Sequence, residues 1–262
     1  MNIYTISMKS SVARKTFHDQ QAREYEVNIH YFDAVDGASL PDEKFNALRY
    51  TYLRPLSKGE VGCFLSHKAL WEKCVELNEP IIILEDDAIL SPNFMSAASQ
   101  VLSQKNIDRV NLEGYYPQKK TFGNRVIPLD GFSLTELYQE RAGAAAYALW
   151  PSGASKLLEH YKNKATLADV ALKKRFLVTY QLEPVVVVQA LICDDYDIPH
   201  SLTLNHTTLG SAGKHSNYSR KWAIILKCKR IMDELRKSMI NLRYIFAKRR
   251  VVRVDKEQFL HK

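Results

Sequence analysis

Three consecutive carboxylates, Glu85, Asp86 and Asp87, follow the apolar run at residues 80–84, which is typical of a strand buried on both faces. If that strand belongs to a parallel sheet, the acids lie at its carboxyl edge, where open α/β sheets bind ligands. Adjacent carboxylates repel one another, and a cation offsets that repulsion. Carboxylate oxygens suit hard divalent ions such as Mg²⁺ or Mn²⁺, shared with substrate phosphates. An acidic strand-to-loop junction in solvent is the alternative that these residues leave open.

Other polar residues lie near predicted strand ends. Arg14 follows the first strand at a spacing from which it could reach a phosphate or a base, and Asp36 ends the second strand. Acids and main-chain groups at such positions can bind the base or ribose of a nucleotide. In residues 59–71, GEVGCFLSHKALW, glycines begin a predicted helix that carries Ser66 and His67. The alternative for His67 is a histidine that is simply hydrogen-bonded within the helix packing.

The elements that must position these residues alternate between strand and helix through most of residues 1–200, which predicts an α/β fold with a mostly parallel central sheet. Strands are predicted at 2–7, 27–34, 80–84, 143–150 and 184–188, and helices at 11–24, 57–77 and 152–161. The phosphate-binding motifs GxxxxGK[ST] and GxGxxG are absent from the sequence, as are GxSxG, HExxH and the kinase signatures. These absences argue against a P-loop ATPase, a dinucleotide oxidoreductase, an α/β-hydrolase and a kinase.

The composition is that of a folded globular protein: 262 residues, 46% hydrophobic and 25% charged. It argues against disordered, collagen-like and disulfide-rich classes. The first residues lack the apolar run of a signal peptide, and no apolar run approaches the ~18 residues that span a bilayer. The four cysteines show neither CxxC spacing nor a histidine at zinc-site spacing, which predicts reduced thiols, mostly in the core. We therefore expect a soluble intracellular protein.

Charge is divided unevenly along the chain. Residues 214–262 hold 15 Lys and Arg against 4 Asp and Glu, a balance of +11, so the other 213 residues carry 22 against 25, or −3. The small polar residues at 210–219 are typical of a linker. We therefore predict a catalytic domain at 1–213 and a basic, amphipathic helical extension at 214–262.

The extension has an apolar stripe at steps of three and four, which predicts a helix. Its members are Ile225, Cys228, Met232, Leu235, Met239, Leu242 and Phe246. Three roles remain open: packing on the catalytic domain, a homodimer seam, or attachment of residues 219–250 to an anionic membrane surface, which we favour. The tail could instead bind nucleic acid through phosphate contacts, although it carries few aromatic residues and no recognised motif, and the acidic body would repel a long polyanion.

The order of several motifs resembles glycosyltransferase family 25, the lipooligosaccharide-type glycosyltransferases. The motifs are IYTISMKSSVAR, FDAVDG, GEVGCFLSHKALW, IIILEDDAIL and AAAYALWPSGASKLLE, and the resemblance covers about residues 2–200. It implies a GT-A-type fold, a UDP-hexose donor and a divalent metal, Mn²⁺ or Mg²⁺. The basic tail lies outside the resemblance.

Carried over by motif, the resemblance makes Asp87 the direct metal ligand, with Glu85 and Asp86 near the ribose or a metal-bound water. Nucleotide contacts would come from Ser7, where the family often has Asn, and from Arg14, Asp36, Ser66 and His67. Asp169 would be the catalytic base. Its alternative is an N-cap carboxylate for a helix at 170–176, and Glu113, Asp194 and Asp195 are rival bases.

The resemblance therefore implies a metal-dependent, inverting hexosyltransferase that moves galactose or glucose from a UDP-sugar to a lipooligosaccharide or lipopolysaccharide core acceptor. Its expected setting is bacterial, cytoplasmic and peripheral on the inner membrane. A nucleic-acid- or membrane-binding α/β protein that uses the basic helix is the alternative. The donor sugar, the acceptor linkage, a histidine ligand to the metal and the oligomeric state stay open.

Overall fold

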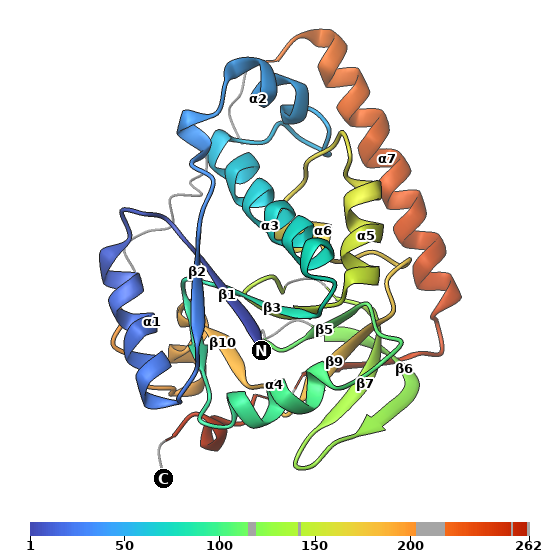
Figure 1. The fold of residues 1–262 in the computed structure, drawn as a ribbon. Helices are drawn as coiled ribbons and strands as arrows, with labels where there is room; N and C mark the ends of the chain where they lie inside the picture. The colour runs from blue at the N-terminus through green and yellow to red at the C-terminus, as the bar shows by residue number, and fades with distance from the viewer. Residues whose placement is uncertain (115–118, 141–142, 203–217, 253, 261–262) are drawn as a thin grey trace.

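A large mixed sheet with helices on both faces forms the body of the protein (Figure 1). The computed structural model describes residues 1–114, 119–140, 143–202, 218–252 and 254–260. The strands are β1 (Asn2–Ser7), β2 (Ile29–Asp33), β3 (Ile81–Glu85), β4 (Ala88–Leu90), β5 (Arg109–Asn111), β6 (Lys119–Pro128), β7 (Ser133–Gln139), β8 (Ala146–Leu149), β9 (Thr179–Glu183), β10 (Val187–Gln189) and β11 (Lys248–Val251). The α-helices are α1 (Val12–Glu24), α2 (Asp42–Arg49), α3 (Lys58–Leu77), α4 (Phe94–Leu102), α5 (Pro151–His160), α6 (Ala168–Ala171) and α7 (Arg220–Arg243).

The central sheet has the strand order β11-β6-β7-β9-β5-β8-β3-β1-β2. β2, β1 and β3 are parallel neighbours, β9 is parallel to β5, and β8 lies antiparallel between β3 and β5. β7, β6 and β11 follow β9 in antiparallel pairs. Within the described residues, six of the nine strands therefore run in one direction and three in the other. Most strands therefore run in the same direction, as the sequence predicts. Neighbouring strands are nevertheless often antiparallel, in part because β8 lies between β3 and β5.

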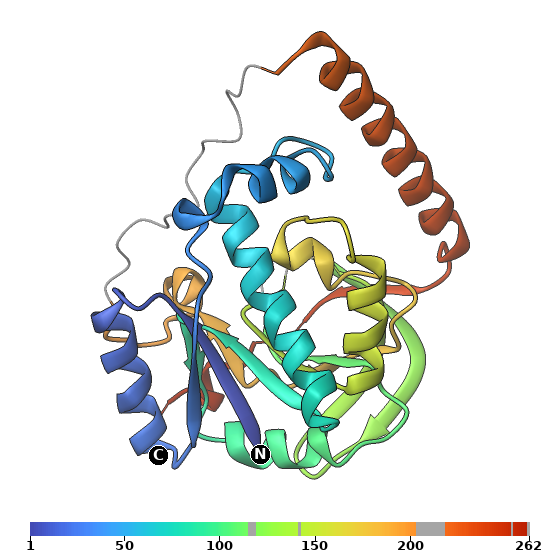
Figure 2. The ribbon, with the colours of Figure 1, turned by 45° about the horizontal axis from the view of Figure 1, so that its top comes forward.

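The alternation of β3 side chains explains why this strand is apolar throughout. Ile81 and Ile83 pack in one cluster with α3 and α5, while Ile82 and Leu84 pack in a second cluster with α4. Figures 1 and 2 show these helices on opposite faces of the sheet. A strand covered on both faces has no place for a polar residue until it leaves the sheet. The acids after Leu84 therefore mark where the strand ends.

The start of α3 is fixed by a capping box between Ser57 and Glu60, as the predicted helix at 57–77 requires. The Ser57 hydroxyl accepts from the Glu60 amide at 3.2 Å, and the Glu60 carboxylate accepts from the Ser57 amide at 2.8 Å. Gly62 lets the loop after β2 approach the helix, because a Cβ there would lie 2.6 Å from the Val35 carbonyl oxygen. This contact brings the ends of β2 and α3 together.

Two predicted elements are wrong in position. The strand expected at 184–188 is divided between β9, which ends at Glu183, and β10, which begins at Val187 and pairs with β4. Pro184 lies between them, and proline has no amide hydrogen to continue a ladder. The helix expected at 170–176 is instead the single turn of α6, Ala168–Ala171.

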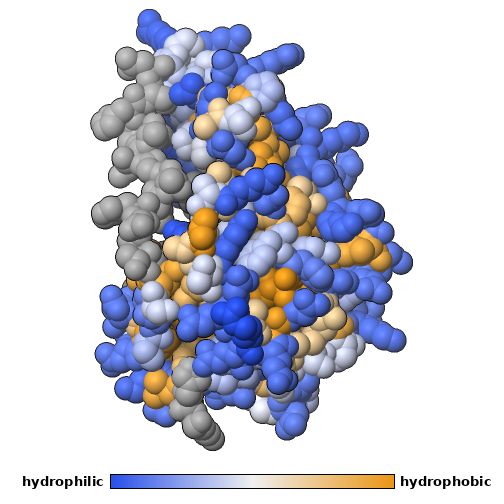
Figure 3. Space-filling model, turned by 60° about the vertical axis from the view of Figure 1, so that its left-hand side comes forward, coloured by the Kyte–Doolittle hydropathy of each residue, from blue (hydrophilic) through white to orange (hydrophobic). Residues whose placement is uncertain are grey.

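The C-terminal segment returns to the body after α7. β11 forms the edge of the central sheet beside β6, and Val252 and Phe259 are buried in a core cluster. The division at residue 213 into two domains stays a prediction. Within the described residues, no helix has the length and apolar character needed to cross a membrane. On the face in Figure 3, hydrophilic side chains predominate and apolar residues form smaller patches.

Candidate functional site

The carboxyl ends of β1 and β3 lie side by side, because the strands are parallel and their register places Glu85 beside the end of β1. β1 ends at Ser7, and β3 is followed by Asp86 and Asp87, which lead into β4. The Asp87 carbonyl oxygen accepts a hydrogen bond from the Ala190 amide at 2.9 Å. This contact ties the acidic turn, Glu85–Asp87, to the segment after β10.

Asp86 is neutralised in part by Arg14, in the first turn of α1, with which it forms an ion pair. The Ser7 hydroxyl also donates to Asp86 Oδ2, at 3.4 Å. Burial raises the pKa of the Asp86 carboxyl, and the Arg14 charge opposes that rise. The structure thus brings together the predicted residues Ser7, Arg14 and Asp86. The Arg14 guanidinium pairs with only one of the three acids.

Asp87 has a carboxylate oxygen that nothing in the described part of the chain satisfies. Its Oδ1 atom is buried and has no hydrogen-bond partner there. Burial, and then the charges of Glu85 and Asp86, raise the pKa of the Asp87 carboxyl to about 7. A buried polar atom without a partner costs about 1–3 kcal/mol. A hard divalent cation would satisfy this oxygen and offset the repulsion, so the acidic turn fits such an ion.

His18 lies one helical turn after Arg14 on α1 and was not anticipated as part of this region. Its side chain is fully buried, and neither ring nitrogen has a hydrogen-bond partner among the described residues. Burial lowers the pKa of His18 to about 4, against the opposing effect of the Asp86 main chain. His18 is therefore neutral near pH 7 and supplies no positive charge to the acids. The four-residue spacing from Arg14 was the signal in the sequence that could have placed it there.

His67, on α3, reaches the acidic turn through a chain of buried polar groups. Its Nε2 atom lies 3.3 Å from Glu85 Oε1, and its Nδ1 atom lies 2.9 Å from the Tyr147 hydroxyl. The Trp71 indole donates to that same hydroxyl at 3.0 Å. If Tyr147 donates its own proton to Nδ1, the His67 proton is on Nε2 and faces Glu85. His67 is thus hydrogen-bonded within the packing and also touches the site.

Cys63 precedes His67 by one turn of α3 and completes a group that the sequence analysis missed. The Cys63 sulfur, a His67 nitrogen and a Glu85 oxygen lie within 4.8 Å of one another. Burial, and then the charge of Glu85, raise the pKa of the Cys63 thiol, so it is protonated near neutral pH. Sulfur and imidazole ligands suit Zn²⁺, whereas Mg²⁺ and Mn²⁺ prefer oxygen. The expectation that no cysteine has a suitably spaced histidine overlooked this four-residue helical spacing.

Asp169 lies in the first turn of α6 and is not its N-cap, which is Leu167. Its carboxylate pairs with Lys173 at 2.9 Å, and its side chain is 39% exposed. The charge of Asp169 and the charges of the acidic turn act on the same Cys63 thiol, whose pKa they raise. The role of Asp169 as a base stays a prediction, because its carboxylate pairs with Lys173 rather than with a residue of the acidic turn.

The rival carboxylates differ sharply in exposure. Glu113 is buried after the end of β5, where its Oε1 atom accepts from the Ala145 amide at 3.0 Å. Burial raises the pKa of the Glu113 carboxyl to about 8, which makes it a neutral acid at pH 7. Asp194 and Asp195 are exposed in a short 3-10 turn after β10. Of these three, only Glu113 lies inside the fold.

The other two predicted nucleotide-binding residues, Ser66 and Asp36, also form hydrogen bonds within the fold. Ser66 Oγ accepts from the Val35 amide at 2.8 Å and donates to the Gly62 carbonyl at 2.9 Å. Asp36 caps a 3-10 turn through its Oδ1, which accepts from the Ala38 amide at 2.9 Å. The Ser66 contact holds the loop after β2 against α3, and the Asp36 contact stabilises the turn within that loop. Ser66 adjoins His67 in α3, so this loop packs on the helix that reaches the acidic turn.

The comparisons with known proteins agree with the motif order. The model of glycosyltransferase family 25 (LPS biosynthesis protein) matches residues 1–172. A "Glycosyltransferase 25 family member" of Aedes aegypti is 30% identical over 177 residues, which cover 60% of this chain and 28% of that protein. The lipooligosaccharide biosynthesis protein lic2B of Haemophilus influenzae is 27% identical over 203 residues, covering 71% of this chain and 75% of that protein.

Human procollagen galactosyltransferase 2 is 31% identical over 124 residues, which cover 42% of this chain and 19% of that protein. The chain therefore spans a minor part of the mosquito and human proteins and most of the Haemophilus protein. All the residues of the acidic turn, together with Cys63, His67 and Asp169, lie within the segment that the family model matches.

Proposed function

Because this chain belongs to glycosyltransferase family 25, we propose that it is a metal-dependent, inverting hexosyltransferase with a GT-A-like catalytic domain at residues 1–213. The observation that carries the proposal is the acidic turn at the carboxyl edge of β1 and β3, with its unsatisfied buried oxygen on Asp87. That edge is where open α/β sheets bind ligands. The turn supplies oxygen ligands for a cation and so a place for the diphosphate of a sugar nucleotide.

The proposed donor is a UDP-hexose, either galactose or glucose, and the proposed acceptor is the core of a lipooligosaccharide or lipopolysaccharide. Galactose is named in the human relative and lipooligosaccharide in the Haemophilus relative. We place the reaction in the cytoplasm, at the inner face of a membrane that carries the glycolipid.

In this mechanism Asp87 would hold Mn²⁺ or Mg²⁺, with Glu85 as the neighbouring acid. A bound metal would act as a Lewis acid toward the diphosphate, on which negative charge grows as the sugar leaves. Arg14 offsets the charge of Asp86 through their ion pair, which lowers the repulsion that the diphosphate would meet. Ser7 and His67 orient the acids through their hydrogen bonds to Asp86 and Glu85.

Asp169 is the proposed base that takes the proton of the acceptor hydroxyl as that hydroxyl attacks the sugar. A single displacement of this kind inverts the anomeric centre, and the sugar passes through an oxocarbenium-like state. Glu113 suits this role less well, because it is buried and protonated at pH 7. The partial exposure of Asp169 leaves room for an acceptor to approach.

The test is slow hydrolysis of a panel of UDP- and GDP-sugars in the presence of Mn²⁺, for the natural protein and for Asp87→Ala. We expect one UDP-hexose to be hydrolysed and the variant to lose the activity while its melting temperature stays nearly unchanged. Glu76→Gln is the matched control, because Glu76 is a surface acid paired with Lys73 on α3. Near-normal turnover by Asp87→Ala would contradict the metal assignment.

A further inference from the structure

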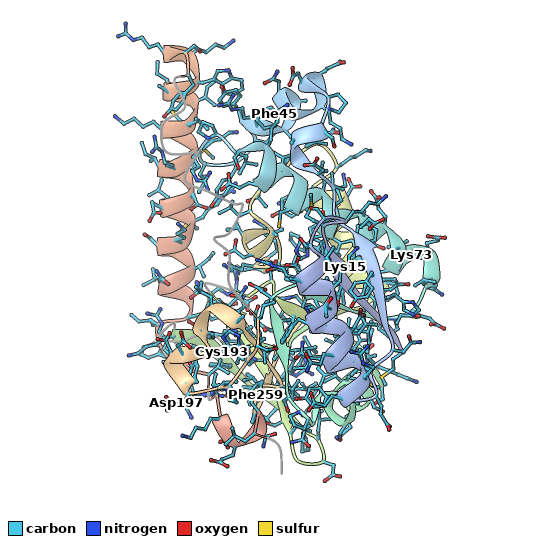
Figure 4. All side chains as sticks on the ribbon, turned by 90° about the vertical axis from the view of Figure 1, so that its left-hand side faces the viewer. Lys15, Phe45, Lys73, Cys193, Asp197 and Phe259 are labelled. Carbon is cyan, nitrogen blue, oxygen red and sulfur yellow. The ribbon has the colours of Figure 1, made fainter. Side chains whose placement is uncertain are left out.

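The outward side of α7 and of the turn after it carries a continuous row of large apolar side chains in solvent. Their exposed fractions run from 52% at Ile231 to 99% at Phe246. Figure 4 shows α7 along one edge of the molecule, with side chains projecting away from the body. We call the row the outward face; its members are Ile224, Ile231, Met232, Leu235, Met239, Leu242, Ile245 and Phe246. Such a row on a soluble protein marks an interaction surface.

A different side of α7 fixes the helix to the body. The Trp222 ring stacks on Tyr50 with centroids 4.4 Å apart, and Leu226 is fully buried. The Lys229 ammonium donates to the Tyr50 carbonyl at 2.8 Å. At the other end, Tyr244 stacks on a tyrosine of β7, again at 4.4 Å. Because both ends are held, the outward face cannot turn inward without breaking these contacts.

The charge around the outward face is positive. Residues 220–243 contain eight Lys and Arg against two acids, a balance of +6. The two acids, Asp233 and Glu234, are both paired with Lys237 at 2.8 Å. Four further exposed cations border the apolar row: Lys227, Arg230, Arg236 and Arg243. A second copy of this face would bring two cationic borders together, which disfavours self-association.

We propose that the outward face of α7 is an interfacial surface that binds an anionic lipid bilayer, with the helix lying in the headgroup plane. An apolar row sinks into the boundary between headgroups and acyl chains, while flanking Lys and Arg side chains contact anionic headgroups. The surface deepens the proposed function, since a glycolipid acceptor lies in a bilayer. It rests on α7 alone and does not depend on the acidic turn.

The test is flotation of the full-length protein with two kinds of vesicle. One kind is phosphatidylcholine alone, and the other contains about 30% phosphatidylglycerol, which makes the surface strongly anionic. We expect recovery with the anionic vesicles only, and less of it at high salt. The double variant Leu235→Glu with Leu242→Glu should lower the apparent vesicle partition coefficient by ~10-fold or more. Val126→Glu is the matched control, because Val126 is 56% exposed on β6; it should float like the natural protein.

Equal flotation of the double variant and the natural protein would overturn the proposal, and so would a lack of binding to anionic vesicles. A natural protein that is dimeric by light scattering, with a monomeric double variant and no vesicle binding, would assign the face to self-association instead. Both substituted residues are exposed, so the variant should keep its melting temperature. Unchanged hydrolysis of the UDP-sugar by the double variant separates this surface from the transferase site.

Discussion

Glu113 offers a sharp test of the electrostatics around the site, through the substitution Glu113→Gln. The carboxyl is buried behind the acidic turn, and its pKa is raised from 4.5 to about 8 by burial. Glutamine has nearly the same shape, stays neutral, and can accept the hydrogen bond from the Ala145 amide that Glu113 Oε1 accepts. The variant therefore keeps the hydrogen bond from the Ala145 amide and removes only the ionisable carboxyl group.

The direction of the pH effect on stability depends on whether the folded or the unfolded chain loses the Glu113 proton first. Below pH 4.5 the carboxyl is protonated in both the folded and the unfolded chain, so the pH has no effect through this group. Between pH 4.5 and about 8 the unfolded chain ionises while the folded protein holds its proton, so stability falls as the pH rises. At ~1.4 kcal/mol per pH unit, the natural protein should lose about 2–3 kcal/mol between pH 5 and pH 7 through this group.

The Glu113→Gln variant should not lose stability in this way as the pH rises, because glutamine does not ionise. Its stability relative to the natural protein should therefore rise by about 2–3 kcal/mol between pH 5 and pH 7, a gain of roughly 5–10 °C in relative melting temperature for a chain of this size. Urea unfolding at several pH values measures the difference directly. The buried Lys120 ammonium opposes the rise of the Glu113 pKa. A stability difference that stays constant from pH 5 to pH 8 would refute the reasoning, because it would mean that Glu113 is ionised in the fold and stabilised by Lys120.

Three other substitutions test the site. Asp169→Asn should leave UDP binding intact and lower hexose transfer by ~10²-fold, measured as product formation; unchanged turnover would move the base role to another acid. Arg14→Ala should raise the donor KM about 10-fold or more, because the Asp86 charge is then unopposed near the diphosphate, and should cost about 1–3 kcal/mol in unfolding, because a largely buried carboxylate loses its partner; an unchanged KM would contradict that role. Tyr147→Phe should lower stability by about 1–3 kcal/mol in urea, since Trp71 and His67 lose a buried partner; no loss would mean that another group replaces it.

The local features of the site could be predicted from the sequence because they depend on neighbours in the chain. The run at 80–84 has no polar residue, so it had to be buried on both faces, and the acids had to mark its end. The Ser57–Glu60 capping box likewise lies within four residues and sets the start of α3. Arg14 could be placed near the acids because a parallel strand and its following helix share one edge of the sheet.

The partners of His67 could not be predicted in the same way. Tyr147 reaches His67 only because β8 enters the sheet antiparallel beside β3, where Tyr147 pairs with Ile83. No local pattern announces that pairing, since a short apolar run such as residues 146–149 looks the same in either direction. The meeting of Cys63, His67 and Glu85 depends on α3 packing over that strand.

The helix α7 shows a second limit of periodicity. A spacing of three and four identifies an apolar face, but it does not say whether that face meets the body of the protein or something outside it. Here α7 contacts the body through Trp222, Leu226 and the Lys229 ammonium, which donates to main-chain oxygens. Few apolar groups take part in this contact. The predicted stripe consequently remains largely in solvent, so packing on the catalytic domain does not explain it. A stripe that the fold leaves uncovered is typical of an interaction surface, and the cations along its borders favour the anionic bilayer proposed above.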